Sequence, residues 1–147
     1  MAIYDYLPTF NYIEPNNLKG LQPGFVVAQN SNVDASLLKE GTKFMENGAI
    51  CALDNTGKIV KGTADSKVLF IHYTEPLHTI INSDKHFAVN TDEECPRLVQ
   101  LIPGDEWMST DPNCAIEGRI IKVTGEGWYK VNTMANGDAG YHYMFLG

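Results

Sequence analysis

The side chains of this sequence that could take part in chemistry are mainly its histidines and cysteines. They include His72, His78, His86, Cys51, Cys95 and Cys114. A cysteine beside a histidine would form a nucleophilic pair, and grouped histidines would bind a transition metal. No C-x-x-C, H-x-H or H-E-x-x-H spacing occurs, so neither a disulfide framework nor a zinc site is indicated. We therefore expect no catalytic residue, metal or cofactor, and we interpret His72 as a hydrogen-bonded sheet residue and Cys51 as a small core residue.

Two acidic groups could bind a cation or supply paired carboxylates. They are Asp92–Glu94 and Asp105–Glu106. Neither has the alternating spacing of a calcium-binding loop, so we interpret both as solvated turns. Gly125 and Gly127 are interpreted as turn residues with positive φ, because no phosphate-binding glycine motif occurs.

The aromatic residues suggest two kinds of binding. Five of them could form a sugar-stacking platform, although aromatic residues in strands more often serve a core or a subunit contact: Trp107, Trp128, Tyr129, Tyr141 and Tyr143. Four others lie among the prolines and glycines of residues 1–24, which disfavour long regular elements: Tyr4, Tyr6, Phe10 and Tyr12. We predict that residues 1–24 form an extended arm, which lies across a neighbour or folds back on its own domain. These four residues and Trp107 are the candidate partner-binding residues.

Composition narrows the possible classes of protein. The chain has 147 residues, a net charge of -7 and 44% hydrophobic residues, which favours one folded domain. No basic run occurs, so we expect no nucleic-acid binding. No signal peptide and no apolar stretch of about 20 residues occur, so we expect no membrane association.

Short strand-like segments separated by turn residues predict a mainly β fold. The predicted strands are Phe25–Gln29, Ala49–Asp54, Lys58–Lys61, Val68–Thr74, His86–Asn90, Arg97–Ile102, Arg119–Thr124, Trp128–Asn132 and Tyr141–Leu146. Residues 119–132 are predicted to form a hairpin. Val33–Glu40 is predicted to be one short helix, with Asp34 as its N-cap. We therefore expect a single small β-sandwich or barrel-like domain over residues 25–147.

Two stretches resemble small structural proteins of tailed phages. Phe44–Lys61 resembles the strand pair of capsid decoration (cement) proteins, and Gly104–Thr110, with the closing strands, is similar to the C-terminal parts of phage virion proteins. The resemblance implies a non-enzymatic virion structural protein, a decoration or head-fibre component that binds the outer surface of the capsid and stabilises the shell.

The same resemblance implies the partners and the location. The partner would be the major capsid protein or another virion protein. The chain would form a homo-oligomer, with a trimer as the first expectation, and would be made in the host cytoplasm and reside on the capsid surface of the virion. A β-sandwich module that binds carbohydrate or a receptor, through Trp107 or Trp128, is the alternative.

Overall fold

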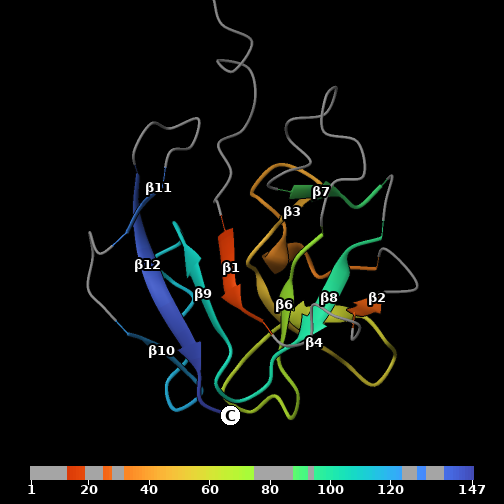
Figure 1. Cartoon of the computed structure of the whole chain (residues 1–147). Coiled ribbons are helices and arrows are strands. Elements are labelled where there is room, and N and C mark those ends of the chain that lie inside the picture. Colours follow the sequence, from red (N-terminus) through yellow and green to blue (C-terminus); the bar gives the residue numbers. More distant parts are fainter. Residues whose placement is uncertain are drawn as a thin grey trace, which may run out of the picture.

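A computed structural model of the chain describes residues 13–18, 25–27, 32–74, 88–92, 95–123, 129–131 and 138–147. These residues form three antiparallel sheets (Figure 1). Sheet A consists of β1 (Ile13–Asn17), β9 (Glu106–Ser109), β12 (Asp138–Phe145), β10 (Ile120–Lys122) and β11 (Tyr129–Val131). Sheet B consists of β2 (Phe25–Val27), β8 (Arg97–Gln100), β6 (Phe70–His72), β4 (Ile50–Leu53) and β5 (Ile59–Lys61). β3 (Phe44–Glu46) and β7 (Ala88–Asn90) form a two-stranded ribbon.

Sheets A and B face each other as a β-sandwich across the first hydrophobic cluster. Both sheets contribute to this cluster: Ile13, Leu18, Ile50, Leu69, Ile71, Val99, Leu101, Trp107, Cys114, Ile120, Tyr143 and Phe145. A second cluster lies on the other side of sheet B, beneath the ribbon: Met45, Cys51, Ile59, Phe70 and Leu98. Sheet B is therefore the middle layer of the molecule.

The sequence of β6 shows how one strand serves two clusters. Leu69 and Ile71 belong to the first cluster, whereas Phe70 belongs to the second. Successive side chains of a strand point to opposite faces, so these consecutive apolar residues divide between the two faces of sheet B. Leu98 and Val99 of β8 divide between the two clusters in the same way.

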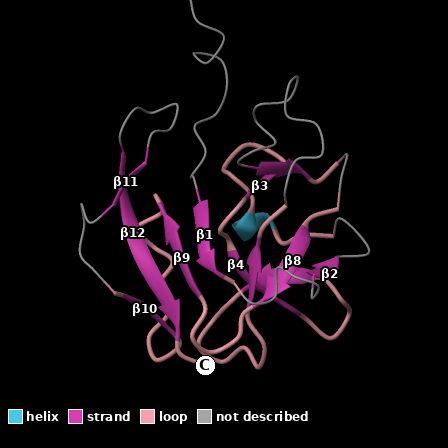
Figure 2. Cartoon of the chain, in the orientation of Figure 1, coloured by secondary structure: helices cyan, strands magenta, loops and turns pink. Residues whose placement is uncertain are grey.

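The predicted helix is present only as one short 3-10 turn, η3 (Ala35–Leu37) (Figure 2). Asp34 caps it as predicted, because its side chain accepts a hydrogen bond from the Ser36 amide at 3.2 Å. The turn ends at Leu37 because Leu38 adopts an extended backbone and forms a β-bridge with Met45. None of the helical structure in the described part of the chain has the length and apolar character that a bilayer-spanning helix requires.

The predicted mainly β fold is confirmed, but two predictions about strands are corrected. Residues 13–18 were assigned to the arm, whereas Ile13–Asn17 forms β1 and pairs with β9. Pro15, which lacks an N–H group, is tolerated because β1 is an edge strand with a register shift between Pro15 and Asn17. The division of the chain at residue 24 stays a prediction for residues 1–12 and 19–24, which lie outside the described residues.

The hairpin predicted over residues 119–132 is not formed. β10 and β11 each pair antiparallel with β12, so they run parallel to each other. The eight residues of β12 are enough to pair with both strands. The sequence did not predict β3 and β9 as strands.

Gly62 directly follows β5, at a point where the chain packs closely against Leu69 and Ile50. A Cβ atom there would lie 2.8 Å from Leu69 Cδ2 and 3.1 Å from Ile50 Cγ2. We predict that Gly62→Ala lowers the free energy of unfolding by about 1 to 3 kcal/mol through overpacking. Urea unfolding measures the change, with exposed Lys61→Ala as the control. A variant as stable as the parent would show that these neighbours move aside.

The Arg119 guanidinium joins three chain segments at one end of the sandwich. Its Nη1 atom donates to the carbonyl oxygens of Ala64 (3.1 Å) and Ser66 (2.7 Å), and its Nε atom donates to that of Gly147 (2.7 Å). The guanidinium carbon also lies 5.8 Å from the centre of the Phe145 ring. Sheet A is thereby tied to the loop between β5 and β6 of sheet B.

We predict that Arg119→Met lowers the free energy of unfolding by about 1 to 2 kcal/mol, because the charge-assisted hydrogen bonds are lost at a partly exposed site. Lys67→Met, which removes an exposed cation nearby, should leave stability unchanged. Equal effects of the two substitutions in urea unfolding would contradict the structural role of Arg119.

Candidate functional site

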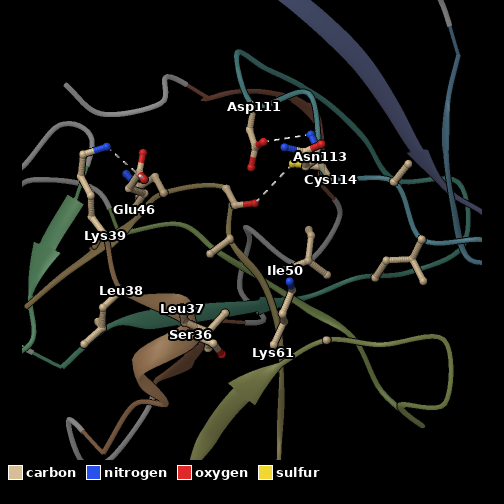
Figure 3. Close-up of a pocket in the computed structure, with 16 residues that line it drawn as sticks. Ser36, Leu37, Leu38, Lys39, Glu46, Ile50, Lys61, Asp111, Asn113 and Cys114 are labelled. Atoms are coloured by element: carbon tan, nitrogen blue, oxygen red, sulfur yellow. Dashed lines mark hydrogen bonds and ion pairs between the residues drawn. The ribbon is translucent and has the colours of Figure 1, made fainter. Parts of the chain in front are cut away.

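A cavity of about 380 Å³ lies between the η3 segment and the loop that follows β9 (Figure 3). Its polar lining includes Lys39 and Glu46 on one side and Asp111 and Asn113 on the other. Lys39 Nζ lies 3.9 Å from Glu46 Oε1, and the Asp111 carboxylate accepts a hydrogen bond from the Asn113 amide at 2.9 Å. These polar groups interact largely within each wall of the cavity.

Cys114 contributes a thiol to the lining of this cavity. Its thiol is buried and lies 3.9 Å from the Gly48 carbonyl oxygen. Burial raises the pKa of the thiol well above its ordinary value, and the Asp111 and Glu46 carboxylates raise it further. Because the thiolate is the nucleophile, Cys114 is protonated and poorly reactive at neutral pH. Cys51, predicted to be a core residue, is fully buried, and burial raises the pKa of its thiol as well.

His72 is the buried histidine of β6. Its Nδ1 atom lies 2.8 Å from the Glu46 carbonyl oxygen, which only accepts, so Nδ1 carries the proton. Its Nε2 atom lies 2.9 Å from the Thr74 hydroxyl, which donates to it and accepts from the Arg97 amide at 2.9 Å. The interpretation of His72 as a hydrogen-bonded sheet residue is confirmed. Burial lowers the pKa of His72 to about 4, so the ring is neutral at pH 7.

The acidic pair at 105–106 is not a solvated turn. Asp105 is fully buried, and its carboxylate accepts a hydrogen bond from the Ile102 amide at 2.8 Å. Glu106 instead belongs to β9, and its Oε1 atom lies 2.9 Å from His142 Nε2. The two carboxylates therefore have separate environments. Among the described residues, no group of three or more His, Cys, Asp and Glu side chains could hold a metal ion.

Sheet A exposes apolar side chains on the face that points away from sheet B, here called the outer face. Ile121 and Val123, at the edge formed by β10, are 39% and 40% exposed. Ile121 pairs with Met144, which pairs in turn with Glu106. Since Ile120 is in the core, alternation directs its neighbour Ile121 outward. Exposed apolar side chains on a sheet face are a feature of surfaces that bind other proteins.

The prediction that Trp107 binds a partner or stacks on a sugar is corrected by the structure. It is fully buried and stacks on Tyr143, with ring centroids 5.9 Å apart and planes at 27°. Its indole therefore supports sheet A from inside and cannot contact a partner. Sequence reasoning missed Ile121 and Val123, although two adjacent isoleucines in a strand imply that one points outward.

The structure describes only some of the other candidate residues. Tyr4, Tyr6, Phe10 and Tyr12 lie outside the described residues, as do Trp128, His78 and His86. Tyr141 packs against the first hydrophobic cluster, and Lys122 Nζ lies 4.3 Å from the centre of its ring.

Comparisons with protein-family models, curated proteins and solved structures find no match to this chain.

The depressed pKa of His72 predicts a pH-dependent stability. In the unfolded chain His72 binds a proton below its ordinary pKa of 6.5, whereas in the folded chain its pKa is about 4. The stability that His72 contributes is therefore complete above pH 6.5 and decreases by about 3 kcal/mol as the pH falls to 4. Urea unfolding at several pH values should show a shallower decrease for His72→Gln. Nitrogen NMR should show the neutral Nδ1–H tautomer at pH 6; a ring that titrates near 6.5 would contradict this prediction.

Proposed function

We propose that this chain is a non-enzymatic virion structural protein that binds the outer surface of a phage capsid through the outer face of sheet A. The observation that carries the proposal is the pair of exposed β-branched side chains, Ile121 in the edge strand β10 and Val123 directly after it. Exposed apolar groups on a sheet are typical of protein interaction sites. The resemblance to decoration proteins supplies the identity of the partner, the major capsid protein or another virion protein.

The packing beneath the outer face makes it a rigid surface, which favours binding to another rigid surface. Trp107 and Tyr143 stack directly below β9 and β12, and their burial fixes the backbone that presents the outer face. A preorganised surface loses little conformational entropy on binding. The contact between Glu106 and His142 places a polar group within the apolar surface, which would add specificity more than affinity.

The charge of the chain is compatible with this role. A net charge of -7 keeps free subunits soluble and apart before assembly. Tyr4, Tyr6, Phe10 and Tyr12 remain proposed partner contacts. The proposed homo-oligomer would repeat the outer face around its axis, with a trimer as the first expectation, and would bind the shell at several points at once.

The alternative, a carbohydrate- or receptor-binding module, receives less support from the described residues. Trp107, one of the two tryptophans of the chain, is buried. A stacking site for sugars would then depend on Trp128.

The proposal predicts that one added charge on the outer face prevents attachment to the capsid. Purified protein is mixed with assembled shells that lack it, and the bound fraction is measured by sedimentation and electron microscopy. Val123→Lys should weaken binding by about ten-fold or more, because a lysine must be desolvated at an apolar contact. Asn55→Lys adds the same charge to an exposed turn far from this face and should bind normally.

Two results would contradict the proposal. Absence of the parent protein from the shells would refute capsid binding, and binding to a glycan array that Trp128→Ala removes would then favour the alternative. Unchanged binding of Val123→Lys would leave capsid attachment intact but would exclude the outer face of sheet A as its site.

A further inference from the structure

The cavity between the η3 segment and the loop after β9 has no part in the proposed capsid contact, because neither Ile121 nor Val123 lines it. Its volume of about 380 Å³ lies in the range of pockets that hold small molecules. The lining is partly made of small residues, which leave the space between the walls unfilled: Gly48, Ala49, Gly62 and Ala115. The cavity is therefore a second candidate binding site.

Hydrogen bonds hold two walls of this cavity in place. On one wall, the Gly48 amide donates to the His72 carbonyl oxygen at 2.7 Å. On the other, the hydroxyl of the buried Tyr143 donates to the Asp111 carbonyl oxygen. The folded domain thus forms both walls by itself, so a ligand would order little of the chain on binding.

Two side chains of opposite charge line the cavity. Asp111 is half-buried in the loop after β9, and Lys61 is the exposed last residue of β5. Neither of them belongs to an ion pair formed within the described part of the chain. The Asp111 carboxylate and the Lys61 ammonium group lie on different sides of the cavity (Figure 3). One ligand could therefore meet both an acidic and a basic group.

The position for a cationic group lies beside Asp111. The Asp111 and Glu46 carboxylates both raise the pKa of the Cys114 thiol, so both charges act at the buried thiol that lines the cavity. The Glu46 carboxylate already lies 3.9 Å from the Lys39 ammonium group. The Asp111 carboxylate instead accepts from a neutral donor, the Asn113 amide. An added cation would thus gain most from Asp111.

Apolar side chains complete the lining. Leu37 and Leu38 come from the η3 segment, whereas Ile50 begins β4 and Ile116 lies in the loop after β9. An apolar group of a ligand would lose water against these side chains, which favours binding. The complete lining thus matches a small molecule that carries one cation, one anion and an apolar group.

We propose that this cavity binds a small zwitterion, an amino acid or dipeptide with a free ammonium group, a free carboxylate and an apolar side chain. The ligand ammonium group lies beside Asp111, its carboxylate beside Lys61, and its side chain against Leu37 and Ile116. A ligand without one of the two charges leaves a charged group of the protein without its partner. This site goes beyond the proposed function, because it needs no capsid and lies away from the outer face of sheet A.

The test titrates small probes into the purified full-length chain and follows the backbone amides of Gly48, Gly62 and Cys114 by NMR. Leucine and alanyl-leucine are the zwitterionic probes, and at least one should bind with a Kd of about 1 mM or below. Acetylation of the ammonium group or amidation of the carboxylate should each weaken binding at least about ten-fold. The stronger of the two zwitterions distinguishes a free amino acid from a peptide as the ligand.

Matched variants assign each charge to its residue. Asp111→Asn keeps the shape of the side chain, and both it and Lys61→Met should bind the zwitterion at least about ten-fold more weakly. Lys61→Glu should reverse the preference, so that the amidated probe, a cation, binds better than the zwitterion. Asp65→Asn and Lys67→Met remove exposed charges outside the cavity and should bind like the parent.

The blocked and free probes are compared on the unaltered chain, so the test stays decisive even where a variant fails to fold. The proposal is overturned if no probe shifts the cavity amides, or if blocked and free probes bind equally well. Unchanged binding by folded Asp111→Asn and Lys61→Met would overturn it as well. None of these results bears on capsid attachment, which is measured separately with assembled shells.

Discussion

The burial of sheet B on both faces is the constraint on which the rest of the structure depends. Its middle strands face sheet A on one side and the ribbon of β3 and β7 on the other. They therefore need apolar side chains at consecutive positions, as in Leu69–Ile71, where a sheet with one wet face would alternate with polar residues. A polar residue at such a position must find its partners within the protein. His72 meets this requirement through Glu46 and Thr74.

The same burial limits the chemistry that the described residues can perform. Burial raises the pKa values of the Cys51 and Cys114 thiols, and burial lowers the pKa of His72. Each group is thereby held in its neutral form at pH 7. The cysteine and histidine side chains, whose types could form a nucleophilic pair or a metal site, instead serve packing and hydrogen bonds between layers.

Local sequence predicted the character of the fold, whereas pairing between distant segments decided the sites. Short strand-like segments separated by turn residues were sufficient to predict a mainly β domain, with sandwich and barrel left as alternatives. Nothing near Trp107 shows that β9 lies between β1 and β12, which is what buries its ring. The hairpin predicted over 119–132 failed because β10 pairs with β12, beyond β11 in the sequence, while β11 pairs with β12 as the next strand along the chain. Ile121 was missed because its exposure depends on being at an edge of the sheet.

The layered order also explains why apolar surface remains where it does. The ribbon and η3 cover part of sheet B, above Phe70 and Leu98, but Leu53 of β4 remains 41% exposed. On sheet A, Ile121 and Val123 are exposed to a similar extent, 39% and 40%. Leu53 and Ile121 therefore lie on opposite outer sides of the molecule, because Leu53 pairs with Ile59 of the second cluster, whereas Ile121 points away from the first cluster. Apolar side chains thus stay exposed where no further layer packs against their sheet.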